Sequence, residues 1–178
     1  LLGGFDALVV AIPAPQALEL FDGHPSADSL FDAAYAPCLA GLFAFERLPA
    51  MREIAREADG PLAWVAHDGG KPGRGEAATI VVQAGADWSR RHLESPKDVV
   101  AADMLAALKD RHPALGEPNH ADVHRWLYAR VEQALGVPCV FDADSRLAFC
   151  GDYCLGPRVE AAFESGRAAG EKLRGVLG

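Results

Sequence analysis

The fold is decided by two neighbouring stretches, LAFCGD at positions 147–152 and, after a short loop, RVEAAFESGRAAG at positions 158–170. The apolar run predicts a strand that stops at Gly151-Asp152, and the small residues after the loop predict a helix from Val159 to about Leu173. The first amides of a helix have no partner inside the helix and carry partial positive charge. The stretch therefore predicts free helix amides and one carboxylate at a single point.

Among the other predicted elements, strands dominate the middle of the chain and helices flank them. Strands are expected at 5–12, 38–45, 62–67, 79–83, 123–129 and 137–141, and helices at 15–21, 26–35 and 95–111. The run 5–12 is continuously apolar, which is typical of a strand covered on both faces. The charged segment 51–58 has helix-forming residues but no apolar stripe. We therefore expect it to be a surface excursion, a segment that leaves the packed core. Together these elements predict an α+β fold, a mixed and mainly antiparallel sheet flanked by helices.

One predicted helix carries a clear apolar face. Ser95 at the cap, Pro96 at the first position and Asp98 mark its start. The apolar side chains that share one face are Val100, Met104, Leu105 and Leu108. This face should pack against the sheet.

Composition and charge exclude several classes of function. The 178 residues are 50% apolar, which is enough for a packed core, and 17 Lys and Arg against 25 Asp and Glu give a formal net charge of −8. Nucleic acids and acidic membrane surfaces require a cationic face, so neither is an expected partner. No apolar run approaches the length of a membrane span, and no secretory signal opens the sequence.

The cysteines and histidines do not suggest a metal site. The four cysteines (Cys38, Cys139, Cys150 and Cys154) are irregularly spaced among apolar residues. Such usage favours free thiols in a reducing compartment, the cytoplasm. A redox pair of Cys150 and Cys154 is a less favoured alternative, and the six histidines lack metal-ligand spacing.

The glycine-rich loop 69–75 contains Lys71 and Arg74, so a phosphate-binding loop has to be considered. A P-loop requires its Lys to be followed by Ser or Thr and a helix, but Pro72 follows Lys71 and the next segment is a strand. No G-x-G-x-x-G or G-x-S-x-G pattern occurs. The loop is interpreted as a hairpin connection, with contact between Lys71 or Arg74 and an anionic substrate as the alternative.

A second candidate site lies in the strand 123–129. On an extended chain His124, Trp126, Tyr128 and Arg130 share one face. This face is too polar for a core and unusually aromatic for a solvent-facing surface. It suits the wall of a pocket that stacks on a planar ligand and donates hydrogen bonds. Cross-strand aromatic packing with the polar tips in water is an equally good interpretation.

The stretch 147–170 also has two interpretations. Gly151 allows close approach of a ligand, Asp152 can accept hydrogen bonds from ribityl hydroxyls, and the helix start can stabilise the negative edge of a reduced flavin. The same pattern fits an ordinary strand-loop-helix closure. Spacing alone leaves both interpretations open.

Five motifs, taken in order, add a family resemblance. They are VVAIPAPQA (9–17), WSR (88–90), HRWLYAR (124–130), CGDYCL (150–155) and RVE (158–160). In this order they resemble bacterial renalase-like flavoproteins, which belong with the flavin-containing amine oxidases. The resemblance covers nearly the whole chain and corresponds to roughly the C-terminal half of a family member.

The resemblance implies an oxidoreductase with non-covalent FAD. Such an enzyme passes hydride from an isomeric dihydronicotinamide, a form of NAD(P)H, to the flavin and then electrons to oxygen, giving hydrogen peroxide. No acid or base residue is implied. The implied FAD contacts are Ile12, Pro13, Gly151, Asp152, Arg158, Val159, Glu160 and Ala161. The expected substrate-binding residues are Trp64, His124, Trp126, Tyr128 and Arg130.

The resemblance also implies a division of the chain. Residues 1–14 would be a strand of the FAD-binding domain, 15–145 the substrate-binding domain, and 146–178 an FAD-contacting strand and helix. Ala161 stands where the family usually has Gly, and Gly156-Pro157 replaces a more usual Ser-Gly. The chain is accordingly expected to be a fragment that lacks the N-terminal dinucleotide-binding half, to retain no FAD and to be inactive by itself.

Two alternatives to this function remain. One is a flavin amine oxidase that uses the aromatic face as a cage for an amine. The other is a non-enzymatic module for ligand binding or interaction that uses the same face. Both are compatible with the residues quoted above.

Overall fold

The computed structural model describes residues 3–49, 54–56, 58–74 and 78–178. The chain forms two compact units. Unit 1 comprises Leu1–Tyr35 and Arg130–Gly178, and unit 2 comprises Ala36–Ala129. Unit 1 is therefore discontinuous in sequence, and unit 2 is one continuous segment.

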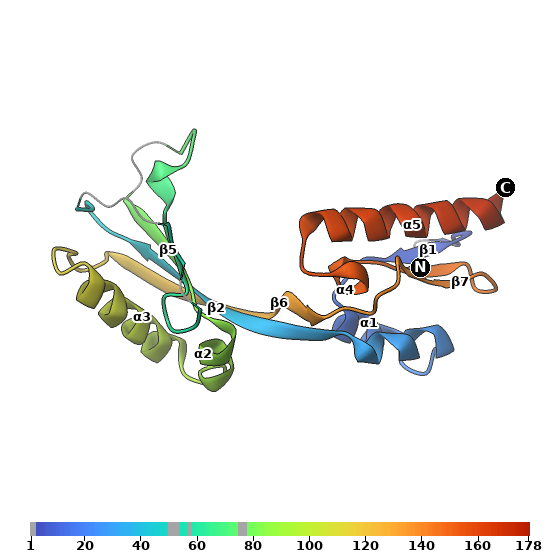
Figure 1. Ribbon diagram of the computed structural model, residues 1–178, viewed down its shortest axis with the longest axis horizontal. Coiled ribbons are helices and arrows are strands. Elements are labelled where there is room, and N and C mark those ends of the chain that lie inside the picture. Colours follow the sequence, from blue (N-terminus) through green and yellow to red (C-terminus); the bar gives the residue numbers. More distant parts are fainter. Residues whose placement is uncertain (1–2, 50–53, 57, 75–77) are drawn as a thin grey trace. The chain divides into compact units, whose positions relative to one another are not determined.

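Unit 1 is built on a small three-stranded sheet (Figure 1). Its elements are β1 (Leu8–Val10), α1 (Ala14–Leu20), η1 (Pro25–Asp32), β7 (Val140–Asp142), β8 (Leu147–Phe149), α4 (Asp152–Leu155) and α5 (Val159–Leu177). The strand order is β1-β8-β7, with β1 parallel and β7 antiparallel to β8. The sheet is thus mixed, as expected.

Helices cover both faces of this sheet (Figure 1). On one face Phe149 is fully buried with Leu30 of η1 and Tyr153 of α4. On the other face Ala148 packs with Ala169 and Leu173 of α5. The alternation of side chains along β8 thus supplies two separate clusters of the core.

The first strand differs from its prediction. Only Leu8–Val10 of the run 5–12 is a strand, and Leu8 and Val9 are 49% and 45% exposed. The reason is its position, because β1 is at the edge of the sheet and its described hydrogen-bonded neighbour is β8 alone. The prediction that this strand is covered on both faces is wrong for the described chain.

Unit 2 is built on a five-stranded sheet in the order β3-β4-β5-β2-β6. Its elements are β2 (Ala34–Ala44), β3 (Ile54–Arg56), β4 (Trp64–His67), η2 (Asp68–Gly70), β5 (Thr79–Gln83), α2 (Ala86–Arg91), α3 (Lys97–Arg111) and β6 (His120–Gln133). The pairs β3–β4, β4–β5 and β2–β5 are antiparallel. The bounds of β2 and β6 extend beyond unit 2, so each strand contributes residues to both units.

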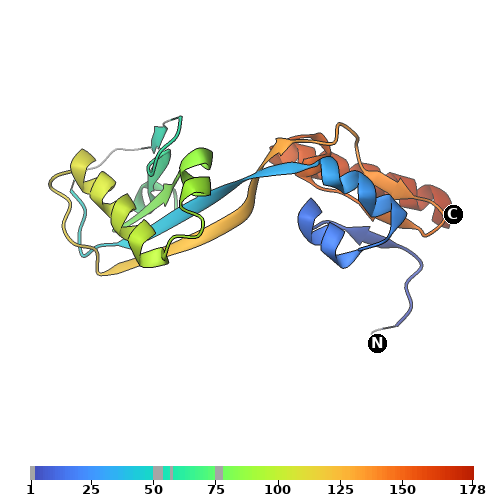
Figure 2. The ribbon, with the colours of Figure 1, turned by 90° about the horizontal axis from the view of Figure 1, so that it is seen from below.

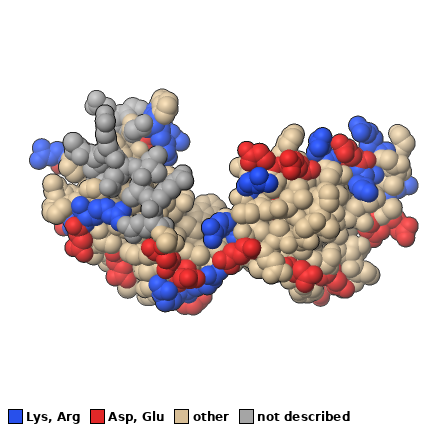
Figure 3. Space-filling model, in the orientation of Figure 1, with Lys and Arg blue, Asp and Glu red and all other residues tan. Residues whose placement is uncertain are grey.

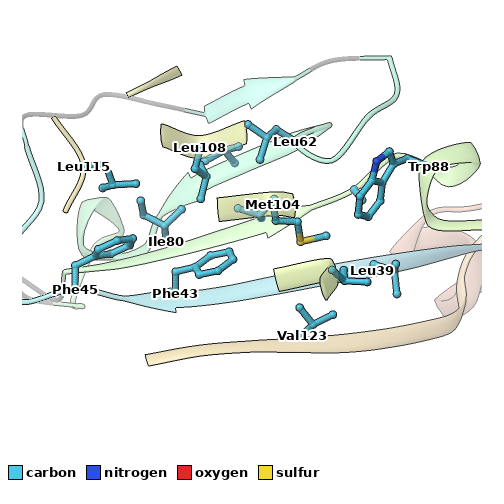
Figure 4. Packing of buried hydrophobic residues seen from close by; sticks show 14 residues of the cluster. Leu39, Phe43, Phe45, Leu62, Ile80, Trp88, Met104, Leu108, Leu115 and Val123 are labelled. Carbon is cyan, nitrogen blue, oxygen red and sulfur yellow. The ribbon is translucent and has the colours of Figure 1, made fainter. Parts of the chain in front are cut away.

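The register of unit 2 determines which side chains face the helices. Phe43 pairs with Ile80, and both point into the core beneath α3, where Met104 is fully buried (Figure 4). A Cβ on Gly41 would lie 2.9 Å from the Met104 sulfur, so this part of the core is closely packed. Trp88 of α2 joins the same cluster, and α2 and α3 lie on the same side of the sheet (Figure 2).

Most predicted elements are confirmed with shifted ends. The strand 79–83 has its predicted bounds, and the helix predicted for 95–111 is α3, with Val100, Met104 and Leu108 buried. Pro96, rather than Ser95, is the residue before its first turn.

Two predicted segments need correction, and two short helices are additional. Ile54–Arg56, predicted as part of a surface excursion, is β3 paired with β4, while 51–53 and 57 lie outside the described residues. The helix predicted for 26–35 is the 3-10 helix η1, which ends at Asp32 before β2 begins. The short helices α2 and α4 were not predicted.

The boundaries of the units also differ from the predicted domains. The sequence placed boundaries after residues 14 and 145, whereas the units divide after Tyr35 and Ala129. The physical reason is packing, since α1, η1 and β7 pack with β1 and β8 in unit 1. The class is α+β, with a mixed sheet and an antiparallel sheet, each flanked by helices.

Candidate functional site

Two of the predicted cofactor segments lie at the same edge of the unit 1 sheet. Ile12-Pro13 follows β1 and Gly151-Asp152 follows β8, and these strands are parallel neighbours with Val10 opposite Phe149. The Cys150 backbone N–H donates to the Val10 carbonyl over 3.0 Å just before both loops begin. Ligands of α/β sheets bind at the carboxyl ends of parallel strands. The structure thus brings these four residues to the same edge, at the carboxyl ends of the two strands.

Gly151 is held by its own chain. Its backbone N–H donates to the Ser165 hydroxyl of α5 over 3.0 Å, and Ser165 is fully buried. A Cβ on Gly151 would lie 2.5 Å from Cε1 of Tyr153. Its backbone is extended, so glycine is needed here for close packing rather than for an unusual conformation. The close approach predicted for a ligand is therefore used by a tyrosine ring.

Asp152 is the first residue of α4 and is half-buried. Burial raises the pKa of its carboxyl above the ordinary value, and the Tyr153 backbone N–H, which hydrogen bonds to the carboxylate, opposes that shift. A partly desolvated carboxylate gains from additional hydrogen-bond donors. Asp152 is suited to accept hydrogen bonds from hydroxyl groups.

The start of α5 has no side-chain cap. Arg158 precedes the first turn, and its backbone N–H donates to the Gly156 carbonyl over 2.8 Å. Gly156 has a φ of 145°, a conformation that favours glycine. Val159 is 85% exposed, Glu160 is exposed and Ala161 is fully buried. Backbone amides at this end can therefore meet an acceptor from outside the helix.

The surface over α5 carries both signs of charge. Figure 3 shows Lys and Arg interspersed with Asp and Glu over this helix. Its charged residues include Glu160, Glu164, Arg167, Glu171 and Lys172. Mixed charge of this kind is typical of a solvated helix face, so the surface gives no indication of a polyanionic partner.

Unit 2 has one sheet face away from α2 and α3, which we call the open face. Val123 of β6 is buried in the core with Met104, so the alternate residues His124, Trp126 and Tyr128 point to the open face. The rings of His124 and Trp126 have centroids 4.1 Å apart at 50°. Trp126 is 54% exposed and Tyr128 is 37% exposed. The predicted shared face is present, and its aromatic surface is accessible.

Trp64 faces the same side from the other end of the sheet. It pairs with Gln83, which pairs in turn with Ala40, so the three residues form one row across β4, β5 and β2. Its neighbour Val65 is buried in the core, which directs Trp64 to the open face. The side chains next to Trp64 in this row of the open face are therefore those of Gln83 and Ala40, one polar and one small.

A groove that the sequence analysis missed lies along the open face. It has a volume of about 360 Å³ and is lined by Leu42, Ala44, Thr79, Val81, Asp68 and His120, together with backbone of the strands. The Thr79 hydroxyl is buried there without a hydrogen-bond partner among the described residues. The alternation of small and apolar residues in β2 and β5 was the available signal. The sequence does not show that these two strands are neighbours, and the groove depends on that pairing.

The remaining candidate residues are placed as follows. Arg130 is exposed and follows Tyr128 on β6, in the part of that strand assigned to unit 1. Lys71 and Arg74 both form ion pairs with Asp68. Residues 75–77 of the adjoining segment lie outside the described chain. In the described part of the chain, no cluster of three His, Cys, Asp or Glu is arranged to bind a metal.

Among the helices in the described ranges, none combines the length and apolarity that a bilayer span requires.

The comparisons with known proteins concern the fold. No protein-family model matches the chain. A crystal structure at 2.06 Å, that of a candidate protoporphyrinogen oxidase from Exiguobacterium sp. 255-15, is similar with a TM-score of 0.69 and 13% sequence identity. The similarity covers 96% of this chain and 41% of that protein. The chain thus has the fold of somewhat less than half of that oxidase.

Proposed function

We propose that this chain is part of an FAD-dependent oxidoreductase in which unit 1 contributes to the flavin site and unit 2 forms the substrate wall. The observation that carries the proposal is the shared edge of β1 and β8. Ile12-Pro13 and Gly151-Asp152 follow the carboxyl ends of these neighbouring parallel strands. The similarity in fold to a candidate protoporphyrinogen oxidase supports an oxidase function of this kind.

The residues of unit 1 fit a flavin in two respects. The partly desolvated Asp152 can accept hydrogen bonds from ribityl hydroxyls, and these bonds would offset the free-energy cost of burying its carboxylate. The uncapped start of α5, at Val159–Ala161, can stabilise negative charge at the ring edge. A bound flavin would supply the hydride-accepting and electron-passing chemistry. The protein's part is to bind it, orient it and exclude water.

Binding of the FAD phosphates is proposed to fall to another part of the polypeptide. The chain contains no G-x-G-x-x-G pattern and spans 41% of the length of the similar oxidase. A dinucleotide-binding segment that contacts the exposed β1 would complete the site. The 178 residues alone should then bind flavin weakly or not at all.

For the substrate we propose a dihydronicotinamide, an isomer of NAD(P)H, as the renalase-like motifs imply. The exposed Trp126 and the neighbouring His124 offer a surface on which a planar ring can stack. Hydride transfer between such a ring and a flavin requires no protein base. The role of the open face is therefore orientation, and oxygen would reoxidise the cofactor to give hydrogen peroxide.

The flavin site is tested with the longer polypeptide that contains this chain. Asp152→Asn should weaken FAD binding about ten- to a hundredfold, since a hydrogen bond to a charged group contributes about 1.5–3 kcal/mol. Asp144→Asn, in an exposed turn, is the matched control and should leave affinity unchanged. Fluorescence titration of apoprotein with FAD measures both variants. Equal affinities for wild type and Asp152→Asn would argue against this flavin site.

The substrate class is tested by anaerobic mixing. An isomeric dihydro-NAD should bleach the flavin absorbance of the intact protein, and oxygen should restore it with release of peroxide. Trp126→Ala should raise KM with little change in kcat, because an exposed stacking residue contributes to binding before the reaction. An unchanged KM would remove the open face from substrate binding.

An amine oxidase is the second candidate. The neighbouring rings of His124 and Trp126 offer a surface for cation–π contact with an amine. Bleaching of the flavin by simple amines, but not by the dihydronicotinamide, would favour this function. An intact protein without flavin would instead favour a non-enzymatic binding module.

A further inference from the structure

Two cysteines flank the hairpin formed by β7 and β8. Its register pairs Asp142 with Leu147, Phe141 with Ala148 and Val140 with Phe149. The strands end at Val140 and Phe149, and one further step of the same register would place the flanking residues Cys139 and Cys150 opposite each other. The turn is fixed by Asp142, whose carboxylate accepts the backbone N–H groups of Asp144 and Ser145 over 3.0 and 3.3 Å. The alignment of the cysteines is therefore set by a well-defined turn.

Both thiols also point to the same face of the sheet. The pair Phe141 and Ala148 faces α5, whereas Val140 and Phe149 belong to the cluster on the opposite face. By alternation, Cys139 and Cys150 face α5 again. Both contact the cluster of Ala148, Ala169 and Leu173. The two sulfurs thus share one apolar environment.

The spacing expected from this register suits a disulfide. Directly opposed residues of an antiparallel pair have Cα atoms about 4.5–5.5 Å apart, within the range of about 4.4–6.8 Å found in disulfides. We propose that Cys139 and Cys150 form a redox pair, which a low-molecular-weight disulfide such as oxidised glutathione converts to an intramolecular cross-strand bond. The inference stands apart from the proposed flavin site.

The two thiols differ in access, which gives the reaction an order. Cys139 is half-buried, whereas Cys150 is 4% exposed. Burial raises the pKa of both thiols, and the Lys172 ammonium of α5 opposes the shift at Cys139. Because the thiolate is the nucleophile, Cys139 reacts first and Cys150 second.

The chemistry balances with the oxidant named. The Cys139 thiolate attacks one sulfur of the small disulfide, forming a mixed disulfide and releasing one thiolate. The Cys150 thiolate then attacks the Cys139 sulfur and releases the second small thiolate. The two protein thiols are oxidised, the small disulfide is reduced to two thiols, and the two protons lost by the cysteines pass to the released thiolates through solvent.

The other two cysteines are the matched controls. Cys38 belongs to unit 2, where its thiol lies 3.7 Å from the Ala84 carbonyl oxygen. Cys154 is fully buried on α4, with its sulfur 4.0 Å from the Phe149 carbonyl oxygen. Neither lies in the ladder of β7 and β8. Cys38→Ser and Cys154→Ala should therefore retain the internal disulfide.

The test treats the reduced 178-residue chain with oxidised glutathione and reads the products by mass spectrometry. The wild type should lose two hydrogens, about 2 Da, with a cross-linked peptide pair containing Cys139 and Cys150. Cys150→Ala should stop at the glutathione adduct on Cys139. Cys139→Ser should give neither product, because Cys150 is inaccessible in the folded chain. Circular dichroism confirms that each variant is folded.

A charge variant provides a second measurement. Lys172→Gln should slow formation of the disulfide about two- to five-fold at low salt without changing the product, and the difference should shrink in high salt. An unchanged rate at low salt would overturn Cys139 as the entry thiol. A cross-link between any other pair, or no internal disulfide in the folded wild type, would overturn the proposal as a whole.

Discussion

A Cβ placed on Gly151 would lie 2.5 Å from Cε1 of Tyr153, whose side chain is 1% exposed. The ring is packed among Leu30, Leu147 and Phe149 and has little room to move. The loop that follows β8 therefore depends on the smallest residue at one position. Its shape is fixed by the core of unit 1 before any ligand is considered.

Gly151→Ala should destabilise the protein by about 1–3 kcal/mol, the usual effect of overpacking a core. Urea unfolding followed by circular dichroism measures the change. Gly166→Ala is the matched control, since Gly166 lies within α5 and a Cβ there meets nothing within 4 Å. That control should gain about 0.5–1 kcal/mol through helix propensity. Equal effects at both positions would contradict the packing described.

Ser165→Ala should cost about 1–3 kcal/mol, because it leaves the Gly151 backbone N–H without its acceptor in a buried place. Ser29→Ala serves as a control, as this exposed hydroxyl donates to the Ser26 carbonyl at the surface. The control should change the free energy of unfolding by less than about 0.5 kcal/mol. A Ser165 variant as stable as the Ser29 variant would show that the bond contributes nothing.

Tyr153→Phe should stabilise the protein or leave it unchanged at pH 7. The Tyr153 hydroxyl is buried and has no hydrogen-bond partner among the described residues, so its removal relieves a desolvation cost of about 1–3 kcal/mol. Thermal unfolding at neutral pH measures the difference. A loss of several degrees would mean that the hydroxyl is bonded after all.

The same variant should alter the response to alkali. Burial raises the pKa of the Tyr153 hydroxyl in the folded protein above its value in the unfolded chain, which is about 10. Above about pH 10 the unfolded chain therefore loses this proton more readily than the folded protein does. The free energy of unfolding consequently decreases as pH rises above that value. Tyr153→Phe should therefore lose less stability than the wild type between pH 9 and 11. Parallel curves for the two proteins would contradict the burial of a titratable group here.

Met104→Ala should cost about 2–5 kcal/mol, since Met104 is fully buried and packs against Phe43 beneath α3. Val99→Ala on the same helix is the control, because Val99 is 46% exposed. It should change stability by less than about 1 kcal/mol. Urea unfolding distinguishes the two, and similar losses would mean that α3 presents another face to the sheet.

Much of the fold could be predicted from the spacing of apolar residues along the sequence. Val100, Met104 and Leu108 recur at helical spacing, and all three are buried as predicted. The run 79–83 is rich in β-branched residues and is β5 with its predicted bounds. Such local signals suffice where one face of an element is apolar and its ends are marked by Gly, Pro or Asn.

Other features depended on contacts between distant segments. Ile54–Arg56 is too short and too mixed to read as a strand, and it is one because β4 lies beside it. Leu8 and Val9 looked like core but lie at a sheet edge, which their apolar character cannot reveal. Gly151 suggested space for a ligand, yet the ring two residues later fills it. Neighbours of this kind are not visible in the spacing of residues.

The parallel pairing of β1 with β8 has a consequence for how the protein is made. Leu8 is synthesised before unit 2, whereas Leu147, its partner, is synthesised only after the whole of unit 2. Unit 2 is one continuous segment and can fold during translation. During that time the apolar residues of β1 cannot pair with β8, because β8 has not been synthesised. The interval exposes an unpaired strand edge, and a translational delay there would leave unit 1 open to aggregation.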